Sequence, residues 1–209
     1  MQEPFRKVIS NFESMSVRPC FPIILLSILS HSTSIKTSQK VLAAASVLKI
    51  PIHSTTQNAP RLGPTVAELA SLATNSLDKT GFSMLSAPGL PARLAPGRWT
   101  VALLGVEAHV CIAQTALALQ RSGHDAVVLA DGVGSVARGE VGLALERLAV
   151  QGGRVTPRGH DAEWGSITVM SSEAFLYEVM QDSAIPEFRE VLKIVKSAAA
   201  DTADAMAIL

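Results

Sequence analysis

Cys111 stands where an apolar, β-rich run passes into a helical pattern, and its thiol is the group best placed for covalent chemistry. Residues 99–106 (WTVALLGV) precede it, and residues 111–123 (CIAQTALALQRSG) include it and continue the chain. In α/β proteins, ligands bind where strands end and helices begin. The first turn of a helix favours a thiolate, and its free N–H groups can bind an oxyanion. The alternative is a buried cysteine that packs as a small apolar side chain.

A nucleophilic cysteine also needs a base and an orienting charge, and three residues are candidates for these roles. Glu107 and His109 lie close to Cys111 in the chain, although solvent exposure or helix capping would also explain them. Lys79 lies in the segment LDKTGFSML (residues 77–85), where a solvated surface charge is the alternative. These residues alone therefore leave a catalytic and a structural interpretation open.

The composition excludes several classes of protein. The chain has 209 residues, 48% of them hydrophobic, and a formal net charge of zero. This length suffices for one domain with a sizeable core, and the neutral charge argues against a nucleic-acid partner. Two cysteines, Cys20 and Cys111, make neither a disulfide framework nor a zinc motif, which favours a reducing, cytoplasmic setting. The apolar run at residues 21–30 (FPIILLSILS) is too short to span a membrane, so no membrane partner is expected.

Strand and helix patterns follow one another along the chain from residue 38 onward. Strands are predicted at residues 50–54, 101–106 and 125–132, and helices at residues 38–49, 107–122, 138–153, 172–182 and 186–197. The alternation predicts an α/β fold with a mostly parallel sheet that is covered on both faces. Residues 197–209, rich in Ala and Asp, read as a loose tail. The segment GVGSVARG lacks the spacing of a dinucleotide-binding loop, so no cofactor is predicted.

The ordered set of segments resembles the isochorismatase-like cysteine hydrolases, the superfamily that includes the nicotinamidases. Residues 105–135 (GVEAHVCIAQTALALQRSGHDAVVLADGVGS) carry the strongest likeness, and residues 49–69, 77–85 and 171–196 match further segments in order. The resemblance implies a three-layer, Rossmann-like sandwich that forms a single domain over residues 1–196. It also implies a homo-oligomer.

The resemblance assigns roles to several residues. Cys111 matches the family's nucleophile and Lys79 its lysine. A cis peptide between Val106 and Glu107 is implied, with the N–H groups of Glu107 and Cys111 directed at the oxyanion. Nicotinamidases also bind a metal through an Asp/His cluster, and no matching cluster follows Gln2, so no metal is predicted here.

Three further residues are predicted to line a substrate pocket, with less support than the catalytic pair. They are Phe5, Gln57 and His109. Phe5 is a pocket wall by resemblance, and an ordinary core phenylalanine is an equally good interpretation.

The chain departs from the family pattern at three places. The family aspartate would lie before Met1, and the first strand, which is central in the family's sheet, is missing with it. Two segments, at about residues 17–34 and 156–168, interrupt the regular spacing as insertions. A start placed too far downstream and two retained introns would explain this pattern, and a genuine, degenerate relative is the alternative. Residues 22–29 (PIILLSIL) have the composition of a buried strand that could fill the empty place.

The sequence therefore leads to two hypotheses about function. The first is a hydrolase that acts on a small-molecule amide or related bond through a cysteine nucleophile, impaired by the absence of the family aspartate. The second is a non-catalytic binding or scaffold protein of the same fold.

Overall fold

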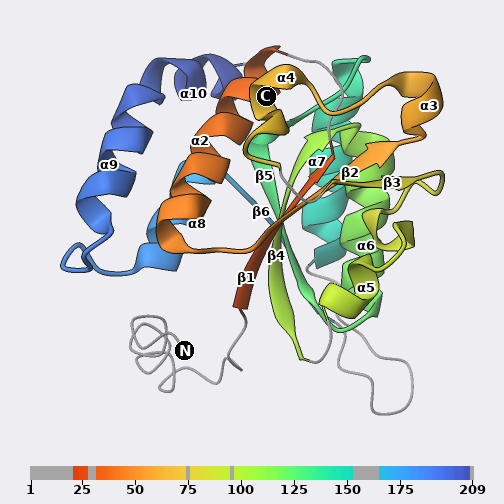
Figure 1. The fold of residues 1–209 in the computed structure, drawn as a ribbon, viewed down its shortest axis with the longest axis horizontal. Coiled ribbons are helices and arrows are strands. Elements are labelled where there is room, and N and C mark those ends of the chain that lie inside the picture. Colours follow the sequence, from red (N-terminus) through yellow and green to blue (C-terminus); the bar gives the residue numbers. More distant parts are fainter. Residues whose placement is uncertain (1–20, 28–31, 74–75, 95–96, 153–164, 208–209) are drawn as a thin grey trace.

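The computed structural model describes residues 21–27, 32–73, 76–94, 97–152 and 165–207. Their strands form one six-stranded sheet in the order β3-β2-β1-β4-β5-β6, and every neighbouring pair is parallel (Figure 1). The strands are β1 (Phe21–Ser27), β2 (Ile52–Gln57), β3 (Ser76–Lys79), β4 (Trp99–Val106), β5 (Asp125–Gly134) and β6 (Ile167–Met170).

Helices cover both faces of this sheet (Figure 1). One face carries α2 (Ser32–Leu48), α8 (Ser172–Met180), α9 (Phe188–Ser197) and α10 (Ala199–Met206). The other face carries α5 (Leu90–Arg93), α6 (Ala113–Arg121) and α7 (Gly139–Gly152). Two short helices, α3 (Ala59–Leu62) and α4 (Ala67–Ala70), follow β2. None of the helices in the described ranges is long and apolar enough to cross a membrane.

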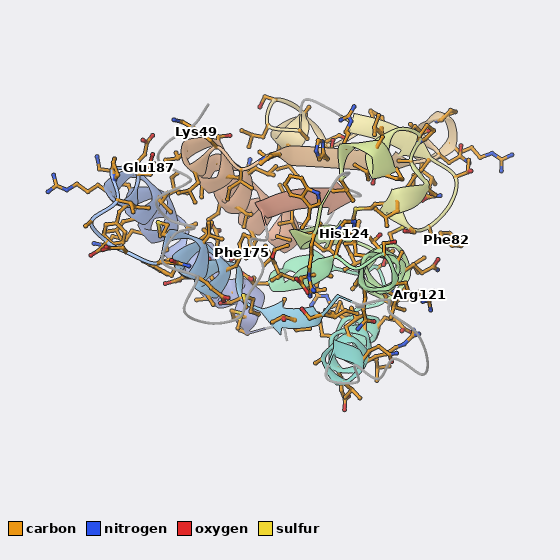
Figure 2. All side chains as sticks on the ribbon, turned by 90° about the horizontal axis from the view of Figure 1, so that it is seen from below. Lys49, Phe82, Arg121, His124, Phe175 and Glu187 are labelled. Carbon is orange, nitrogen blue, oxygen red and sulfur yellow. The ribbon has the colours of Figure 1, made fainter. Side chains whose placement is uncertain are left out.

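Two apolar cores lie on the two faces of the sheet, because successive residues of a strand point to opposite sides. Ala102 and Leu104 of β4 belong to the core beneath α2, whereas Val101 and Leu103 belong to the core beneath α6 and α7. Figure 2 shows Phe175, a member of the first core, on α8, at the side of the sheet that α2 and α9 cover. The predicted three-layer α/β sandwich with a parallel sheet is confirmed.

The middle of the sheet is occupied by β1, so the prediction of a missing central strand is wrong. Ile24 of β1 is in register with Ile52 of β2 on one side and with Ala102 of β4 on the other. The segment FPIILLS has no polar alternation, as expected for a strand that is covered on both faces. Part of the predicted insertion at 17–34 thus supplies the strand that the family pattern requires, and α2 begins within the same segment.

The second predicted insertion, at 156–168, is described only from residue 165 onward, where its last residues enter the edge strand β6. Residues 153–164 lie outside the described ranges. The extent of the single domain, residues 1–196, stays a prediction.

The chain end also differs from the expectation of a loose tail at 197–209. Residues 199–206 form α10, which packs against α2. The Lys40 ammonium of α2 donates to the Thr202 hydroxyl oxygen at 2.7 Å and pairs with the Asp131 carboxylate at 3.4 Å. Asp131 in turn accepts a hydrogen bond from the Ser172 backbone N–H at 2.6 Å. A buried polar network therefore connects α10, α2, β5 and the start of α8.

Candidate active site

Cys111 lies in a single π-helical turn, Ala108–Ile112, between the end of β4 and the start of α6. Cys111 is 5% exposed as a residue. The apolar residues of β4 bury this strand in the sheet, and the turn that follows brings the thiol to the carboxyl edge. This is the edge at which parallel α/β sheets bind ligands.

The Lys79 side chain reaches the sulfur from the end of β3. Its Nζ lies 3.7 Å from Cys111 Sγ, although the two residues are 32 positions apart. The same Nζ donates to the carbonyl oxygens of Gly81 and Phe82, at 3.1 and 3.0 Å. Lys79 is only 3% exposed, so the interpretation of a solvated surface charge is wrong.

Gln57 completes this cluster from the end of β2. Gln57 and Lys79 are register partners in the parallel pair of β2 and β3, which places both side chains on the same face. Gln57 Oε1 accepts from Lys79 Nζ at 2.5 Å and lies 3.9 Å from Cys111 Sγ. Gln57 was predicted as a pocket residue, and the structure brings it into direct contact with both predicted catalytic side chains.

Thr115 is a residue of this site that the sequence interpretation missed. Its hydroxyl donates to the Cys111 carbonyl oxygen at 2.6 Å and accepts from the Met84 backbone N–H at 2.9 Å. The hydroxyl therefore joins the helix that carries Cys111 to the segment after Lys79. A threonine four residues after a helical carbonyl often donates to it, so the spacing from Cys111 was an available signal.

Gly81 allows the loop after β3 to fold tightly beneath Lys79. A Cβ atom at Gly81 would lie 2.5 Å from Ser86 Oγ and 2.9 Å from Ser86 Cβ, which is closer than real contacts of this kind. The absence of a side chain thus lets the Gly81 carbonyl approach the ammonium.

Burial and nearby charge shift the pKa of Lys79 in opposite directions. Burial lowers its pKa below the usual lysine value because it removes water from the ammonium, and the nearby Cys111 sulfur opposes part of this fall. Asp78, the preceding residue, is directed elsewhere. Its carboxylate accepts from the Ala59 N–H and the Thr56 hydroxyl, and these bonds lower the pKa of Asp78.

The turn before Cys111 contains the implied cis peptide. The bond between Val106 and Glu107 is cis, which confirms that expectation. The Glu107 carboxylate accepts from the Val136 N–H at 3.0 Å, and the His109 ring nitrogen Nδ1 lies 3.3 Å from Ser135 Oγ. Both side chains thus contact the loop after β5, and neither has a hydrogen bond to Cys111 among the described contacts.

Phe5 lies outside the described residues, as do Met1 and Gln2, so the structure places only part of the predicted site. In the described ranges, no carboxylate forms a hydrogen bond or ion pair with the side chain of Lys79 or of Cys111, although, against the larger effect of burial, the charge of Asp78 raises the pKa of the neighbouring Lys79. No group of three or more His, Cys, Asp or Glu side chains that could hold a metal ion occurs in this part of the chain. The predictions that the protein uses no metal and no cofactor stay predictions.

The chain is similar to known proteins in sequence and in fold. Residues 30–158 match the model of the isochorismatase domain. A secreted isochorismatase effector of Phytophthora sojae is 33% identical over 172 residues, which cover 78% of this chain and 75% of the relative.

Two solved structures share the fold. The MAR1 ribonuclease of Caenorhabditis elegans has a TM-score of 0.72 and 28% identity, over 86% of this chain and 91% of that protein. The YcaC gene product of Escherichia coli, described as an octameric hydrolase of unknown specificity, has a TM-score of 0.70 and 18% identity. That match covers 92% of this chain and 96% of YcaC.

Proposed function

The chain belongs to the isochorismatase domain family, and from this premise we propose that it hydrolyses a small-molecule amide or related bond with Cys111 as the nucleophile. The observation that carries the proposal is the distance of 3.7 Å between Cys111 Sγ and Lys79 Nζ, with both side chains buried at the carboxyl edge of the sheet. An ammonium at this distance stabilises a thiolate, the nucleophilic form of cysteine.

The first half of the proposed reaction forms a thioester. The thiolate of Cys111 attacks the amide carbon, a carbon–sulfur bond forms, and the carbonyl π electrons move to oxygen. When these electrons return, the carbon–nitrogen bond breaks and the departing amine takes a proton from the Lys79 ammonium. Burial lowers the pKa of Lys79, which makes its ammonium a better acid near neutral pH.

The second half releases the acid. Water attacks the thioester carbon, and the neutral Lys79 amine takes a proton from that water. Cleavage of the carbon–sulfur bond returns the Cys111 thiolate and the Lys79 ammonium. The pair acts first as acid and then as base, so this route consumes one amide and one water and needs no carboxylate. We assign the oxyanion to the backbone N–H groups of Glu107 and Cys111, and contact with the bound substrate to Phe5 and His109.

A second candidate function is a binding or scaffold protein that has lost hydrolysis. It is favoured by the finding that, within the described residues, no carboxylate forms a hydrogen bond or ion pair with the side chain of Cys111 or of Lys79. In such a protein the Cys111–Lys79 pair lacks a positioned carboxylate base, and a positioned general base typically contributes about 10²–10⁴-fold to a rate.

The substrate we propose is a small molecule. One structural relative is a ribonuclease, but the net charge of zero does not favour an RNA partner for this chain. Because the E. coli relative is octameric, we propose a homo-oligomer here as well. We also propose a cytoplasmic location because a free, buried thiol at the site suits a reducing compartment, although the P. sojae relative is secreted.

The test uses the full chain with Cys20 changed to Ser, so that Cys111 is the only thiol. The protein is incubated with a panel of primary and secondary carboxamides, carboxylic esters and a short RNA, and product is measured by chromatography. Intact mass spectrometry measures acyl adducts on the protein. We expect turnover of an amide or ester that Cys111→Ser abolishes and Lys79→Met lowers by about 10²-fold or more.

Three outcomes would contradict this function. Turnover that survives Cys111→Ser would exclude the nucleophile, and cleavage of RNA alone would exclude the substrate class. If no substrate turns over and Cys111 alkylates no faster than glutathione at neutral pH, the binding or scaffold function replaces the hydrolase.

A further inference from the structure

The amide of Gln57 is held in one orientation by contacts at both of its ends. Its Nε2 donates to the Thr80 carbonyl oxygen at 2.7 Å, and a carbonyl oxygen can only accept. Oε1 must therefore be the atom that faces Lys79 Nζ at 2.5 Å. A flipped amide would place an N–H group against the ammonium and lose both hydrogen bonds.

This orientation favours the charged form of Lys79. Nζ contacts three oxygens that can only accept, namely Gln57 Oε1 and the carbonyl oxygens of Gly81 and Phe82. An ammonium has three N–H groups to donate, whereas a neutral amine has only two. All three contacts are satisfied only if Lys79 is an ammonium, in spite of its burial.

We propose that Gln57 is a positioning residue that holds the Lys79 side chain as an ammonium ion against the sulfur of Cys111. This inference rests on the proposed function, because it assigns a role within the same site. Gln57 acts through Lys79, since the contact of Oε1 with Nζ, at 2.5 Å, is much shorter than its contact with Sγ, at 3.9 Å.

A neutral acceptor suits this role better than a charged one. An amide oxygen stabilises the ammonium without neutralising it, so the positive charge remains available to the Cys111 thiolate. A carboxylate at the same place would form an ion pair with Lys79 and repel the thiolate. Among the described residues, the Lys79 ammonium thus contacts one ionisable sulfur and three neutral oxygens.

The remaining titratable groups near the sulfur are each engaged elsewhere. On the elements around Cys111 in the described structure, they are Asp78, Glu107 and His109. Asp78 is held by Thr56 and Ala59, Glu107 by the Val136 N–H, and His109 contacts Ser135. Among the titratable groups of the described residues, Lys79 is therefore the one through which a change at residue 57 reaches the sulfur, beside the direct contact of Gln57 Oε1 with Sγ at 3.9 Å.

The experiment measures the rate at which iodoacetamide alkylates Cys111 as a function of pH, in the Cys20→Ser background. The main variant is Gln57→Met, which keeps the length of the side chain and removes both polar atoms. Without Oε1 the buried ammonium is less stable and attracts the thiolate less. We expect the midpoint of the pH profile to move upward by about one unit, which slows alkylation near neutral pH by about tenfold.

Gln57→Glu is the second variant, because it preserves the shape of the side chain if the methionine protein fails to fold. Its carboxylate competes with the thiolate for Lys79, so we expect an upward shift at least as large. Gln39→Leu is the control, since Gln39 lies on α2 and its side chain contacts only the exposed Glu68 carbonyl among the described residues. This control should leave the profile unchanged.

The readouts separate the possible results. A purely structural role for Gln57 would lower the melting temperature of the variants and leave the midpoint where it is, and that result would overturn the proposal. If Cys111 of the unsubstituted protein alkylates like a free thiol, with pKa about 8.5, the result contradicts the proposed function and not only the role of Gln57. A fast wild-type reaction combined with an unchanged Gln57→Met midpoint would overturn only the role of Gln57.

Discussion

The Thr115 hydroxyl donates to the Cys111 carbonyl oxygen at 2.6 Å while it accepts from the Met84 N–H at 2.9 Å. One fully buried side chain thereby connects the helix of the proposed nucleophile to the segment after Lys79. Lys79 ends β3 and Cys111 follows β4, and β2 and β1 lie between these two strands in the sheet. The distance between Cys111 and Lys79 therefore depends on this connection.

Thr115→Val should weaken both the fold and the site. The substitution keeps the shape of the side chain but leaves the buried Met84 N–H without its acceptor, which costs about 1–3 kcal/mol. Urea unfolding measures that loss, and alkylation of Cys111 near neutral pH should slow at the same time. Thr115→Ser retains the hydroxyl and is expected to preserve the alkylation rate. Equal rates in the valine and serine proteins would show that the connection does not position the thiol.

Gly81→Ala should disturb the carbonyl oxygens that hold Lys79. The new methyl group would lie 2.5 Å from Ser86 Oγ and 2.9 Å from Ser86 Cβ, so the Ser86 side chain or the loop must shift, and overpacking of this kind costs about 1–3 kcal/mol. The alkylation rate of Cys111 should fall together with the stability. The double variant Gly81→Ala/Ser86→Gly removes the contact and should recover both. If the double variant is as impaired as the single one, the clash with Ser86 is not the cause.

The scaffold was more predictable from the sequence than the site. The helix at 107–122 and the strands around it follow from local periodicity, and the structure has them as the π turn, α6, β4 and β5. The proximity of Cys111 and Lys79 came from a family resemblance, since no local pattern relates residues 32 positions apart. The contact of Gln57 with Lys79 depends on the register of β2 with β3, which single-strand patterns do not specify.

The two clear errors have a common physical cause. The central strand β1 and the helix α10 both depend on distant partners. The segment 21–27 gains its hydrogen bonds from β2 and β4, which follow it by 25 residues and more. The Ala-rich end gains its anchor from the contact of Thr202 with Lys40, 162 positions away. The departure from the family's spacing therefore indicated an insertion at the first segment, and the Ala- and Asp-rich composition indicated a loose tail at the second.

Lys40→Met should be strongly destabilising. The Lys40 and Asp131 side chains are both fully buried, so removing the ammonium leaves the carboxylate with its hydrogen bond from Ser172 but without a positive partner, at a cost of about 3–5 kcal/mol. Chemical denaturation measures the loss. Lys36→Met, at an exposed position of the same helix, is the matched control and should change stability little. The double variant Lys40→Met/Asp131→Asn removes the charge but keeps an oxygen that can accept from the Ser172 N–H. It should be more stable than Lys40→Met alone, and the reverse order would contradict the ion pair.

His53 should make the fold less stable as the pH falls. Burial, and to a smaller extent the Arg93 guanidinium, lower the pKa of His53 below the usual value of about 6.5, and Arg93 donates to His53 Nδ1 at 3.2 Å. Between the lowered folded pKa and the unfolded one, the unfolded chain binds more protons, so stability decreases with acidification through this range. At higher pH the His53 ring is neutral in both the folded and the unfolded chain, so His53 no longer makes the stability depend on pH.

The measurement compares wild type with His53→Asn by urea unfolding at about pH 8 and about pH 5.5, on either side of the ordinary histidine value. The variant should lose less stability between the two conditions. His124, whose pKa is also lowered by burial, titrates in both proteins, so its contribution cancels in the difference. Parallel losses in the two proteins would show that His53 is not the source of the acid sensitivity.

Ile24→Pro tests whether residues 21–27 are the central strand. The backbone of Ile24 is in register with Ile52 and Ala102 at once, and proline removes the N–H group that the ladder requires. In the middle of a sheet this loss should abolish cooperative unfolding and leave Cys111 and Lys79 without a common support. Ile24→Val keeps the N–H group and a β-branched side chain, and it should unfold cooperatively near the wild-type midpoint. If the proline protein instead melts like the valine protein, residues 21–27 do not occupy the centre of the sheet, and the site loses the strand that separates β2 from β4.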